Sequence, residues 1–303
     1  MRISPQMPQL VLNALQTSDT AEQKALQQLT TGRRVNVASD DPAAAAQEVN
    51  ISGQMNNVDQ YLRSISSIYS ELQTADSSLN SVVTSLQAAI SLGVQGANST
   101  LSQSNRTTIA QQIKNITQQV FNVANLSYNG TYVFAGTATS QPPYVMDPTA
   151  PDGIRYQGND NVNMVEIQQG QAVAVNQPGS QLFSAPGASV FQALNDLTTA
   201  LENPNSTTDD VGNAVTELRG AYDQLTAART FYGSTVDQIL GTQNFLNNQS
   251  VQLGQQQNST IGIDMNVAAT NLTQAQEARN ATVQAAASLN SVTLMDYLST
   301  IGR

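Results

Sequence analysis

The chain of 303 residues contains no histidine and no cysteine. Without these residues, neither a Ser-His-Asp triad nor a Cys-His nucleophile can form. Thiolate and imidazole metal sites are excluded as well, which removes nearly all zinc, copper, haem and iron–sulfur centres. No disulfide can stabilise the fold, so packing or assembly must do so. The sequence therefore predicts a protein that is not an enzyme and needs no cofactor.

Charged and aromatic residues are scarce, and tryptophan is missing altogether. Charged residues make up 11% of the chain, against about 25% in an average soluble domain. The net charge of -10 disfavours duplex nucleic acid and anionic membrane surfaces as partners, because both attract positive charge. No apolar run approaches the roughly 20 residues that span a bilayer, and the N-terminal segment lacks the apolar stretch of a Sec signal peptide. We therefore expect neither a membrane protein nor a Sec substrate.

The first third of the chain carries an apolar pattern with spacings that alternate between four and three residues. Its positions are Ile51, Met55, Val58, Leu62, Ile65, Tyr69, Leu72, Asp76, Leu79, Val83, Leu86 and Ile90. This heptad pattern predicts a long helix that packs against another helix. A second pattern of this kind, interrupted by three polar residues, lies between Val211 and Leu253, and a shorter one lies between 109 and 123. We expect the two long helices to run alongside each other.

The segment from Thr131 to Phe183 has a different pattern. Short β-prone runs such as Val165-Glu166-Ile167 alternate with Pro- and Gly-containing turns, and six of the ten prolines lie between 142 and 186. We expect mostly antiparallel strands that few contacts join to the helices, so that the segment tolerates removal. The fold class predicted for the whole chain is α+β. It is a long-helix coiled-coil bundle, formed by the N- and C-terminal segments, with an inserted small antiparallel β domain.

The same patterns predict a division into domains. Residues 1–40 form an N-terminal assembly helix, 41–130 with 187–263 a discontinuous helical bundle, 131–186 the inserted β domain, and 264–303 a C-terminal assembly helix. Both assembly helices carry leucines for which the chain offers no obvious further cover. A lone pair of such helices is marginal, because helical stability comes mainly from packing of the apolar face. We therefore expect the ends to become ordered between subunits, through Leu12, Leu15, Leu26, Leu29, Leu272, Leu289, Leu294 and Leu298.

Two features could suggest polar chemistry, but each has a simpler interpretation. The adjacent pairs Asp40-Asp41 and Asp209-Asp210 could serve acid–base catalysis or bind Mg²⁺. Both lie at expected helix starts, where capping explains them more simply. The run around Asn159 matches only part of a calcium loop, since it lacks the glycine and the distal glutamate. We expect a β-turn there.

One segment resembles the N-terminal motif of the bacterial flagellin family. It reads Leu29-Thr30-Thr31-Gly32-Arg33-Arg34-Val35-Asn36, followed by Ala38-Ser39-Asp40-Asp41-Pro42-Ala43. In that family a helix ends at the glycine, the chain turns through the arginine and asparagine, and a long helix starts after the paired aspartates. The resemblance adds Gly32, Arg33, Asn36, Asp40 and Asp41 to the candidate assembly interface.

Within the family, three further segments resemble the proteins of the junction between hook and filament. They are Asn129-Gly130-Thr131-Tyr132-Val133-Phe134-Ala135-Gly136, Val190-Phe191-Gln192-Ala193-Leu194 and the ending Leu294-Met295-Asp296-Tyr297-Leu298. The resemblance implies a structural, extracellular component of the flagellum that is exported by the flagellar type III apparatus. The partners it implies are identical subunits in a ring, a hook-associated neighbour on the hook side, flagellin on the filament side, and an export chaperone.

Two alternatives stay open. The chain could be a flagellin-type subunit of the filament itself, which would extend long filaments alone. It could also be a secreted coiled-coil adhesin, whose export would not depend on flagellar components.

Overall fold

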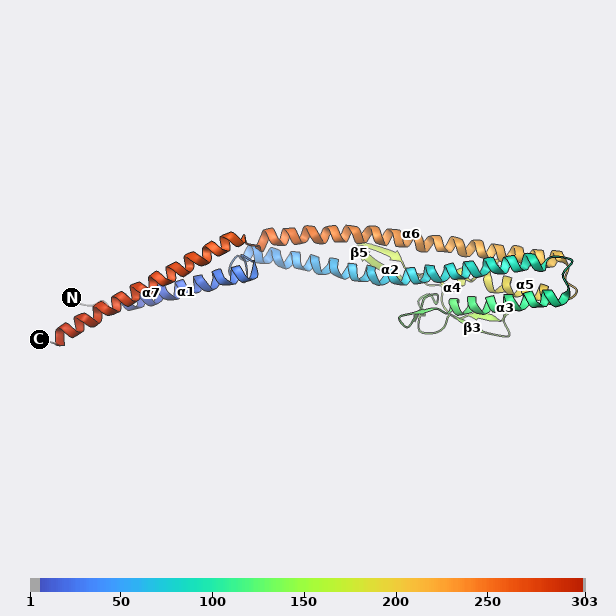
Figure 1. Cartoon of the computed structure of the whole chain (residues 1–303), viewed down its shortest axis with the longest axis horizontal. Helices are drawn as coiled ribbons and strands as arrows, with labels where there is room; N and C mark the ends of the chain where they lie inside the picture. Colours follow the sequence, from blue (N-terminus) through green and yellow to red (C-terminus); the bar gives the residue numbers. More distant parts are fainter. Residues whose placement is uncertain (1–5, 302–303) are drawn as a thin grey trace. The chain divides into compact units, whose positions relative to one another are not determined.

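The computed structural model describes the backbone of residues 6–301 and the side chains of residues 9–288. Its longer helices are α1 (Gln6–Thr31), α2 (Pro42–Gly96), α3 (Gln103–Ala124), α5 (Val190–Glu202), α6 (Thr208–Ile261) and α7 (Met265–Ile301) (Figure 1). The chain divides into two compact units. We call residues 58–247 the central unit and residues 1–57 with 248–303 the end unit. Helices α2 and α6 contribute to both units.

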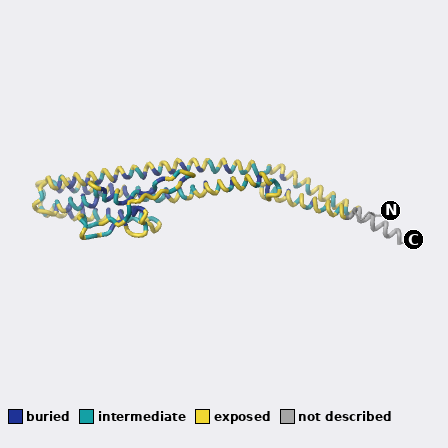
Figure 2. Tube along the Cα trace, turned by 180° about the vertical axis from the view of Figure 1, so that it is seen from behind, coloured by how far each residue is buried: buried dark blue, intermediate teal, exposed yellow. Residues whose placement is uncertain are grey.

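In the central unit, α2 and α6 lie side by side in antiparallel directions, so the predicted pairing of the two long helices is present there (Figures 1 and 2). The Arg229 guanidinium on α6 binds the Asp76 carboxylate on α2, with Nε 2.9 Å from Oδ1. Helices α3 and α5 lie against each other in the same unit, and Gln103 on α3 donates to the carbonyl groups of Leu201 and Glu202 at the end of α5. The predicted helix bundle is therefore confirmed.

The predicted apolar pattern is right for one half of its positions and wrong for most of the other half. Ile51, Val58, Ile65, Leu72, Leu79 and Leu86 are all buried as expected. Relative to the alternate predicted positions Tyr69, Asp76, Val83 and Ile90, the helix buries a second row of residues that lies one position earlier. This second row is Ile68, Ala75, Val82 and Ala89. Helix α6 shows the same shift, since it buries Ala221, Ala228, Thr235 and Thr242 instead of Tyr222 and Val236. Small side chains let two helices approach closely, whereas Tyr69 and Asp76 remain at the edge of the contact.

The strands form four separate antiparallel pairs rather than one sheet within the described residues. The pairs are β1 (Ser127–Tyr128) with β2 (Thr131–Tyr132), β3 (Tyr144–Met146) with β4 (Ile154–Tyr156), β5 (Met164–Gln168) with β6 (Gln171–Ala174), and β7 (Ser184–Ala185) with β8 (Ala188–Ser189). The short helix α4 (Gly179–Leu182) precedes β7. A two-stranded pair is marginal in water by itself. The hairpins must therefore depend on packing against other parts of the unit.

An aromatic cluster supplies much of that packing. Tyr144, Phe183 and Phe191 are almost fully buried, and the ring centroids of Tyr144 and Phe191 lie 5.1 Å apart. Phe191 belongs to α5, so the hairpins and the helical bundle share one core. The Asn125 side chain adds two hydrogen bonds to the backbone of Tyr144. Our expectation that few contacts would join the segment from Thr131 to Phe183 to the helices was wrong. The division of the chain into domains stays a prediction.

Close backbone approach explains a glycine of the junction-protein-like segment. Gly136 has a φ of +71°, and a Cβ there would lie within 3 Å of the Asn159 backbone. Asn159 accepts hydrogen bonds from the backbone N–H groups of Thr137 and Asn161 through its side-chain oxygen. Residues 159–163 form no turn, so the β-turn predicted there was wrong. The amide of Asn159 holds the loop by local hydrogen bonds instead.

In the end unit, α1 lies beside α7, and the first turns of α2 lie beside the last turns of α6 (Figure 1). Glu48 on α2 accepts a hydrogen bond of 2.7 Å from Gln257 on α6. Few described side chains are buried in this unit, and most of the residues in α1 and α7 are half-buried or exposed (Figure 2). The buried ones are Ser18, Ala25, Val35, Ala44, Ile51, Leu253, Ile261 and Ala268. Within the described part of the chain, no helix is both long enough and apolar enough to cross a membrane.

Candidate assembly surface and the loop between α1 and α2

The loop between α1 and α2 begins with a glycine in the left-handed region. Gly32 has a φ of +68°, and its N–H donates to the carbonyl of Gln28 at 2.9 Å. Glycine adopts this conformation without steric cost, which makes it the preferred residue just after a helix end. The predicted end of the first helix at Gly32 is confirmed.

Asp40 ties this loop to α1. Its carboxylate accepts hydrogen bonds from the backbone N–H groups of Asn36 and Val37 and pairs with the Lys24 ammonium at 2.8 Å. The hydrogen bond from Lys24, and then those from the two backbone N–H groups, lower the pKa of Asp40 from 3.8 to about 2. The carboxylate therefore serves to hold the loop, and the donors that surround it oppose the protonation that acid catalysis would need.

Asp41 starts α2, as capping predicts. Its Oδ1 accepts the backbone N–H of Ala44 at 3.1 Å, and this hydrogen bond and the Arg34 guanidinium lower the pKa of Asp41. At the start of α6, Asp210 and Thr207 exchange hydrogen bonds between side chain and backbone in a capping box. Among the described residues, no three acidic side chains converge on a site that could hold a metal ion.

Arg34 reaches from the loop to the end of α6. Its guanidinium donates to the Asp41 carboxylate and to the carbonyl of Thr260, each at 3.1 Å. Its backbone N–H donates to the carbonyl of Ile261 at 2.6 Å, and the N–H of Ile263 donates to the carbonyl of Gly32 at 3.1 Å. Arg34 lies within the flagellin-like motif but was not among the predicted interface residues. Nothing in the sequence distinguishes it from its neighbour Arg33.

The other motif residues act within the chain as well. Arg33 forms an antiparallel bridge with Gly262, and the Asn36 side chain donates to the carbonyl of Arg33 at 2.9 Å. The side chains of Val35, Ala44 and Ile261 make a small buried cluster beneath this bridge. These contacts bring the loop, the start of α2 and the end of α6 together.

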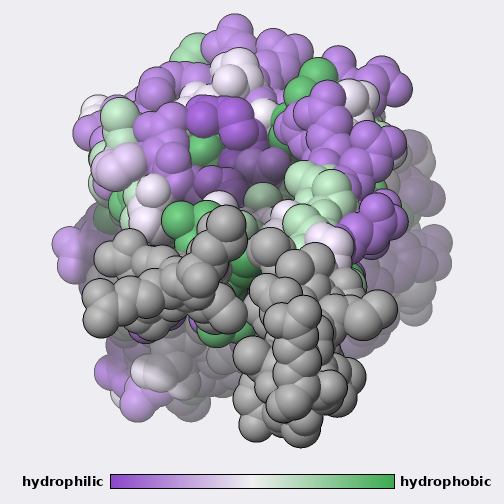
Figure 3. Space-filling model, turned by 90° about the vertical axis from the view of Figure 1, so that its left-hand side faces the viewer, coloured by the Kyte–Doolittle hydropathy of each residue, from purple (hydrophilic) through white to green (hydrophobic). Residues whose placement is uncertain are grey.

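The predicted interface leucines divide into three groups. Leu12 and Leu26 on α1 are 58% and 50% exposed. Leu15, Leu29 and Leu272 are half-buried, whereas Leu289, Leu294 and Leu298 lie outside the residues whose side chains the structure describes. Seven further apolar residues of the end unit are exposed but were not among the predicted interface residues, namely Leu10, Val37, Val49, Val251, Met265, Val267 and Val283. Figure 3 looks toward the chain termini and shows green apolar patches between hydrophilic side chains.

Polar contacts hold α1 and α7 together. Arg279 on α7 pairs with Asp19 and Glu22 on α1. Among the side chains of the two helices that the structure describes, the buried ones are small, such as those of Ala25 and Ala268. Exposed ion pairs contribute little to stability, typically about 0.2–1 kcal/mol. Among the described residues, the two helices therefore leave the side chains of Leu12 and Leu26 uncovered.

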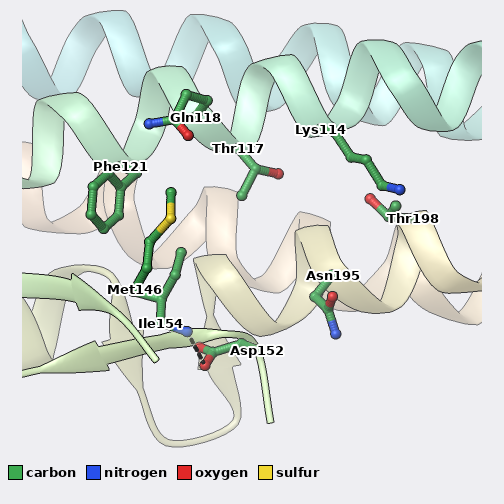
Figure 4. A pocket seen from close by; sticks show the side chains of 9 residues that line it. All are labelled: Lys114, Thr117, Gln118, Phe121, Met146, Asp152, Ile154, Asn195 and Thr198. Atoms are coloured by element: carbon green, nitrogen blue, oxygen red, sulfur yellow. Dashed lines mark hydrogen bonds between the residues drawn. The ribbon is translucent and has the colours of Figure 1, made fainter. Parts of the chain in front are cut away.

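A shallow hollow in the central unit lies between α3, α5 and the β3–β4 hairpin (Figure 4). Phe121, Met146 and Ile154 line one side of it, and Asp152 accepts the backbone N–H of Ile154 at 3.2 Å. Its volume is about 140 Å³, whereas small-molecule sites usually measure about 300–1,000 Å³. The hollow has room for about one side chain.

Comparison with known proteins agrees with this arrangement of helices. The sequence pattern of the bacterial flagellin N-terminal helical region matches residues 3–139, and that of the bacterial flagellin C-terminal helical region matches residues 195–298. The chain belongs to the bacterial flagellin family. The segment between the two matches contains β3 to β8.

Curated relatives include hook-associated proteins and flagellins. The flagellar hook-associated protein 3 of Escherichia coli K12 is 24% identical over 97% of this chain and 98% of its own length. The protein of the same name from Salmonella typhimurium is 28% identical over 61% of this chain and 57% of its own length. The phase 2 flagellin of Salmonella abortus-equi is 26% identical, over 75% of this chain but only 46% of its own length.

Solved structures share the fold. A putative flagellar hook-associated protein from Vibrio parahaemolyticus superimposes with a TM-score of 0.69 at 19% identity, covering 74% of this chain and all of that one. The Bacillus cereus protein FlgL superimposes with a TM-score of 0.59 at 24% identity, covering 69% of this chain and 99% of that one.

Proposed function

We propose that this chain is a structural subunit of the bacterial flagellum that joins the hook to the filament. The observation that carries the proposal is the match to a hook-associated protein over nearly the full length of both chains. The flagellin relative is matched over less than half of its own length. A junction subunit therefore fits better than a filament subunit, and the flagellar location with hook and filament proteins as neighbours follows from the family.

We propose further that copies of this chain assemble through the end unit. Leu12 and Leu26 are exposed on a weakly held helix pair, and a second copy is the occupant that a ring of identical subunits would supply. Burying a leucine contributes about 1.5–3 kcal/mol. Ordering the backbone costs about 1–2 kcal/mol per residue, so assembly would have to bury many apolar side chains at once.

Export through the flagellar type III apparatus, with a chaperone bound before export, completes the proposal. The absence of cysteine supports it, since a chain that is threaded unfolded gains nothing from disulfides. An adhesin would instead leave the cell when the flagellar export apparatus is disabled, so secretion in such a strain distinguishes the two.

Deletion of the gene tests the junction role most simply. We expect cells with hooks, no attached filaments and flagellin released into the medium, and we expect the wild-type gene to restore filaments. Filaments of normal number on the deletion strain would refute the proposal. If the purified chain extended long filaments alone, the filament subunit would be the better interpretation.

A further inference from the structure

We infer that residues 32–41 form a latch that holds the break between α6 and α7, with Arg34 as its positioning residue. Helix α6 ends at Ile261 and α7 begins at Met265, so three residues interrupt what would otherwise be one helix of great length. The interrupting residues include no proline. Gly262 is a weak helix former, and Asp264 caps the start of α7 by accepting the backbone N–H of Asn266 at 2.7 Å. These local features favour a break, and a distant segment adds to their effect.

Residues 32–34 supply hydrogen-bond donors and an acceptor to the break between α6 and α7. In a continuous helix, the carbonyl groups of Thr260 and Ile261 would accept from N–H groups four residues later. Here the Arg34 guanidinium donates to the carbonyl of Thr260, and the Arg34 backbone N–H donates to the carbonyl of Ile261. The N–H of Ile263, which would donate back into α6, donates to Gly32 instead. The latch thus replaces the hydrogen bonds that a continuous helix would make.

Two ion pairs hold the latch residues in place. Asp41 holds the guanidinium of Arg34 from the first turn of α2, and Lys24 holds Asp40 from α1. A planar guanidinium can serve the carboxylate and the carbonyl together, whereas a lysine ammonium presents a single point charge. The start of α7 therefore depends on a side chain more than 220 residues away.

Amide hydrogen exchange on the full-length chain tests the latch, with Arg34→Gln compared to Arg33→Gln. The neighbouring variant is a matched control, because it removes the same charge from the same loop while the Arg33 side chain makes no ion pair among the described residues. Losing hydrogen bonds to a half-exposed charged group should change local exchange about five- to tenfold. We expect that change at the amides of Arg34, Val35 and Ile263 in the Arg34→Gln variant alone.

Two further variants guard against a general loss of folding. Asp41→Asn keeps the cap of α2, since asparagine caps as well as aspartate, but it weakens the hold on Arg34. It should produce the same pattern with a smaller change. Arg34→Lys should restore less than half of the lost protection. Exchange in residues 109–120 of the central unit should stay unchanged in every variant.

Three results would overturn the latch. The first is equal exchange at residues 259–265 in the Arg34→Gln and Arg33→Gln variants. The second is full protection in Arg34→Lys. The third is a wild-type chain in which the amides of Arg34, Val35 and Ile263 exchange as fast as in an unfolded peptide. Lost protection that is confined to Arg34→Gln and Asp41→Asn supports it, since the freed end of α6 then frays.

Discussion

The central unit and the end unit are built from similar helices but are held together by different forces. In the central unit, long apolar side chains such as Leu72, Leu79 and Phe191 are fully buried. In the end unit, the contacts between α1 and α7 combine small buried residues with ion pairs of Arg279, and Leu12 is 58% exposed. Apolar burial dominates folding energetics. The central unit therefore has a core of large apolar side chains, whereas the end unit leaves leucine side chains such as that of Leu12 exposed.

The side-chain hydrogen bonds of the central unit and of the end unit also have different roles. In the central unit, side chains such as Asn125 and Gln103 satisfy backbone groups of segments that the core already holds. In the end unit, Asp40, Asp41 and Arg34 hold segments with little core beneath them. Polar residues there determine the arrangement of the chain, and variants in the two units should respond differently.

The largest effect is expected in the aromatic cluster. Phe191→Ala removes a fully buried ring that joins α5 to Tyr144, and such truncations cost about 3–5 kcal/mol of unfolding free energy. Urea denaturation followed by tyrosine fluorescence measures the change. A loss below 1 kcal/mol would mean that the hairpins and the helices do not share a core, and would revive the idea of a removable β domain.

Two glycines offer a matched test within the central unit. A Cβ at Gly93 would lie 2.6 Å from Val215 Cγ2, whereas a Cβ at Gly233 would meet nothing. Gly93→Ala should therefore destabilise by about 1–3 kcal/mol through overpacking. Gly233→Ala should stabilise the exposed helix by about 0.5–1 kcal/mol. Thermal denaturation of both variants measures these changes, and we expect Tm to fall in Gly93→Ala and to rise in Gly233→Ala. Equal shifts of Tm would contradict the close approach of α2 and α6.

Acid should loosen the end-unit loop through Asp40. The folded pKa of about 2 lies below the ordinary value of 3.8. The contribution of this carboxylate is therefore present above about pH 4 and is lost as pH falls toward 2. Amide exchange of residues 32–45, measured as a function of pH and corrected for intrinsic rates, should show this step. Asp40→Asn should abolish it, and an unchanged step in that variant would assign it to another group.

The smallest effect on stability is expected for exposed leucines of α1. Leu26→Asp should change the unfolding free energy by no more than about 0.5 kcal/mol, as is usual for surface positions. The same variant should fail to restore filaments in a deletion strain, because it places a charge on the proposed assembly surface. Ser66→Asp, a substitution at an exposed position of α2 in the central unit, serves as the control. Normal filaments with Leu26→Asp would remove Leu26 from the interface.

Much of the fold could be predicted from local patterns. The spacing of Ile51, Val58 and Ile65 predicted a long packed helix, and Asp41 predicted its start. The second row of contacts was missed at Ala75, which is small and buried, whereas Asp76 lies at the edge of the contact and pairs with Arg229 on α6. Alanine carries a weak apolar signal, so a search for large apolar residues chose the wrong neighbour.

Long-range polar contacts could not be predicted at all. No periodicity links Arg34 to Thr260, because they meet only after the whole bundle has brought α6 back to the loop. The grouping of the strands into four separate pairs was not predicted either, because a local β-prone run does not show which other run it pairs with. The leucines of the candidate interface stay a prediction from the sequence. Of the five whose side chains the structure describes, Leu12 and Leu26 are exposed.

Amide exchange of the purified monomer and of the assembled structure tests the contrast between the two units most directly. We predict that residues 10–30 and 266–288 exchange rapidly in a proven monomer and become protected on assembly, whereas residues 109–120 of the central unit are protected in both states. Strong protection of residues 10–30 and 266–288 in the monomer would contradict the account, because the end unit would then be stable without a neighbouring subunit.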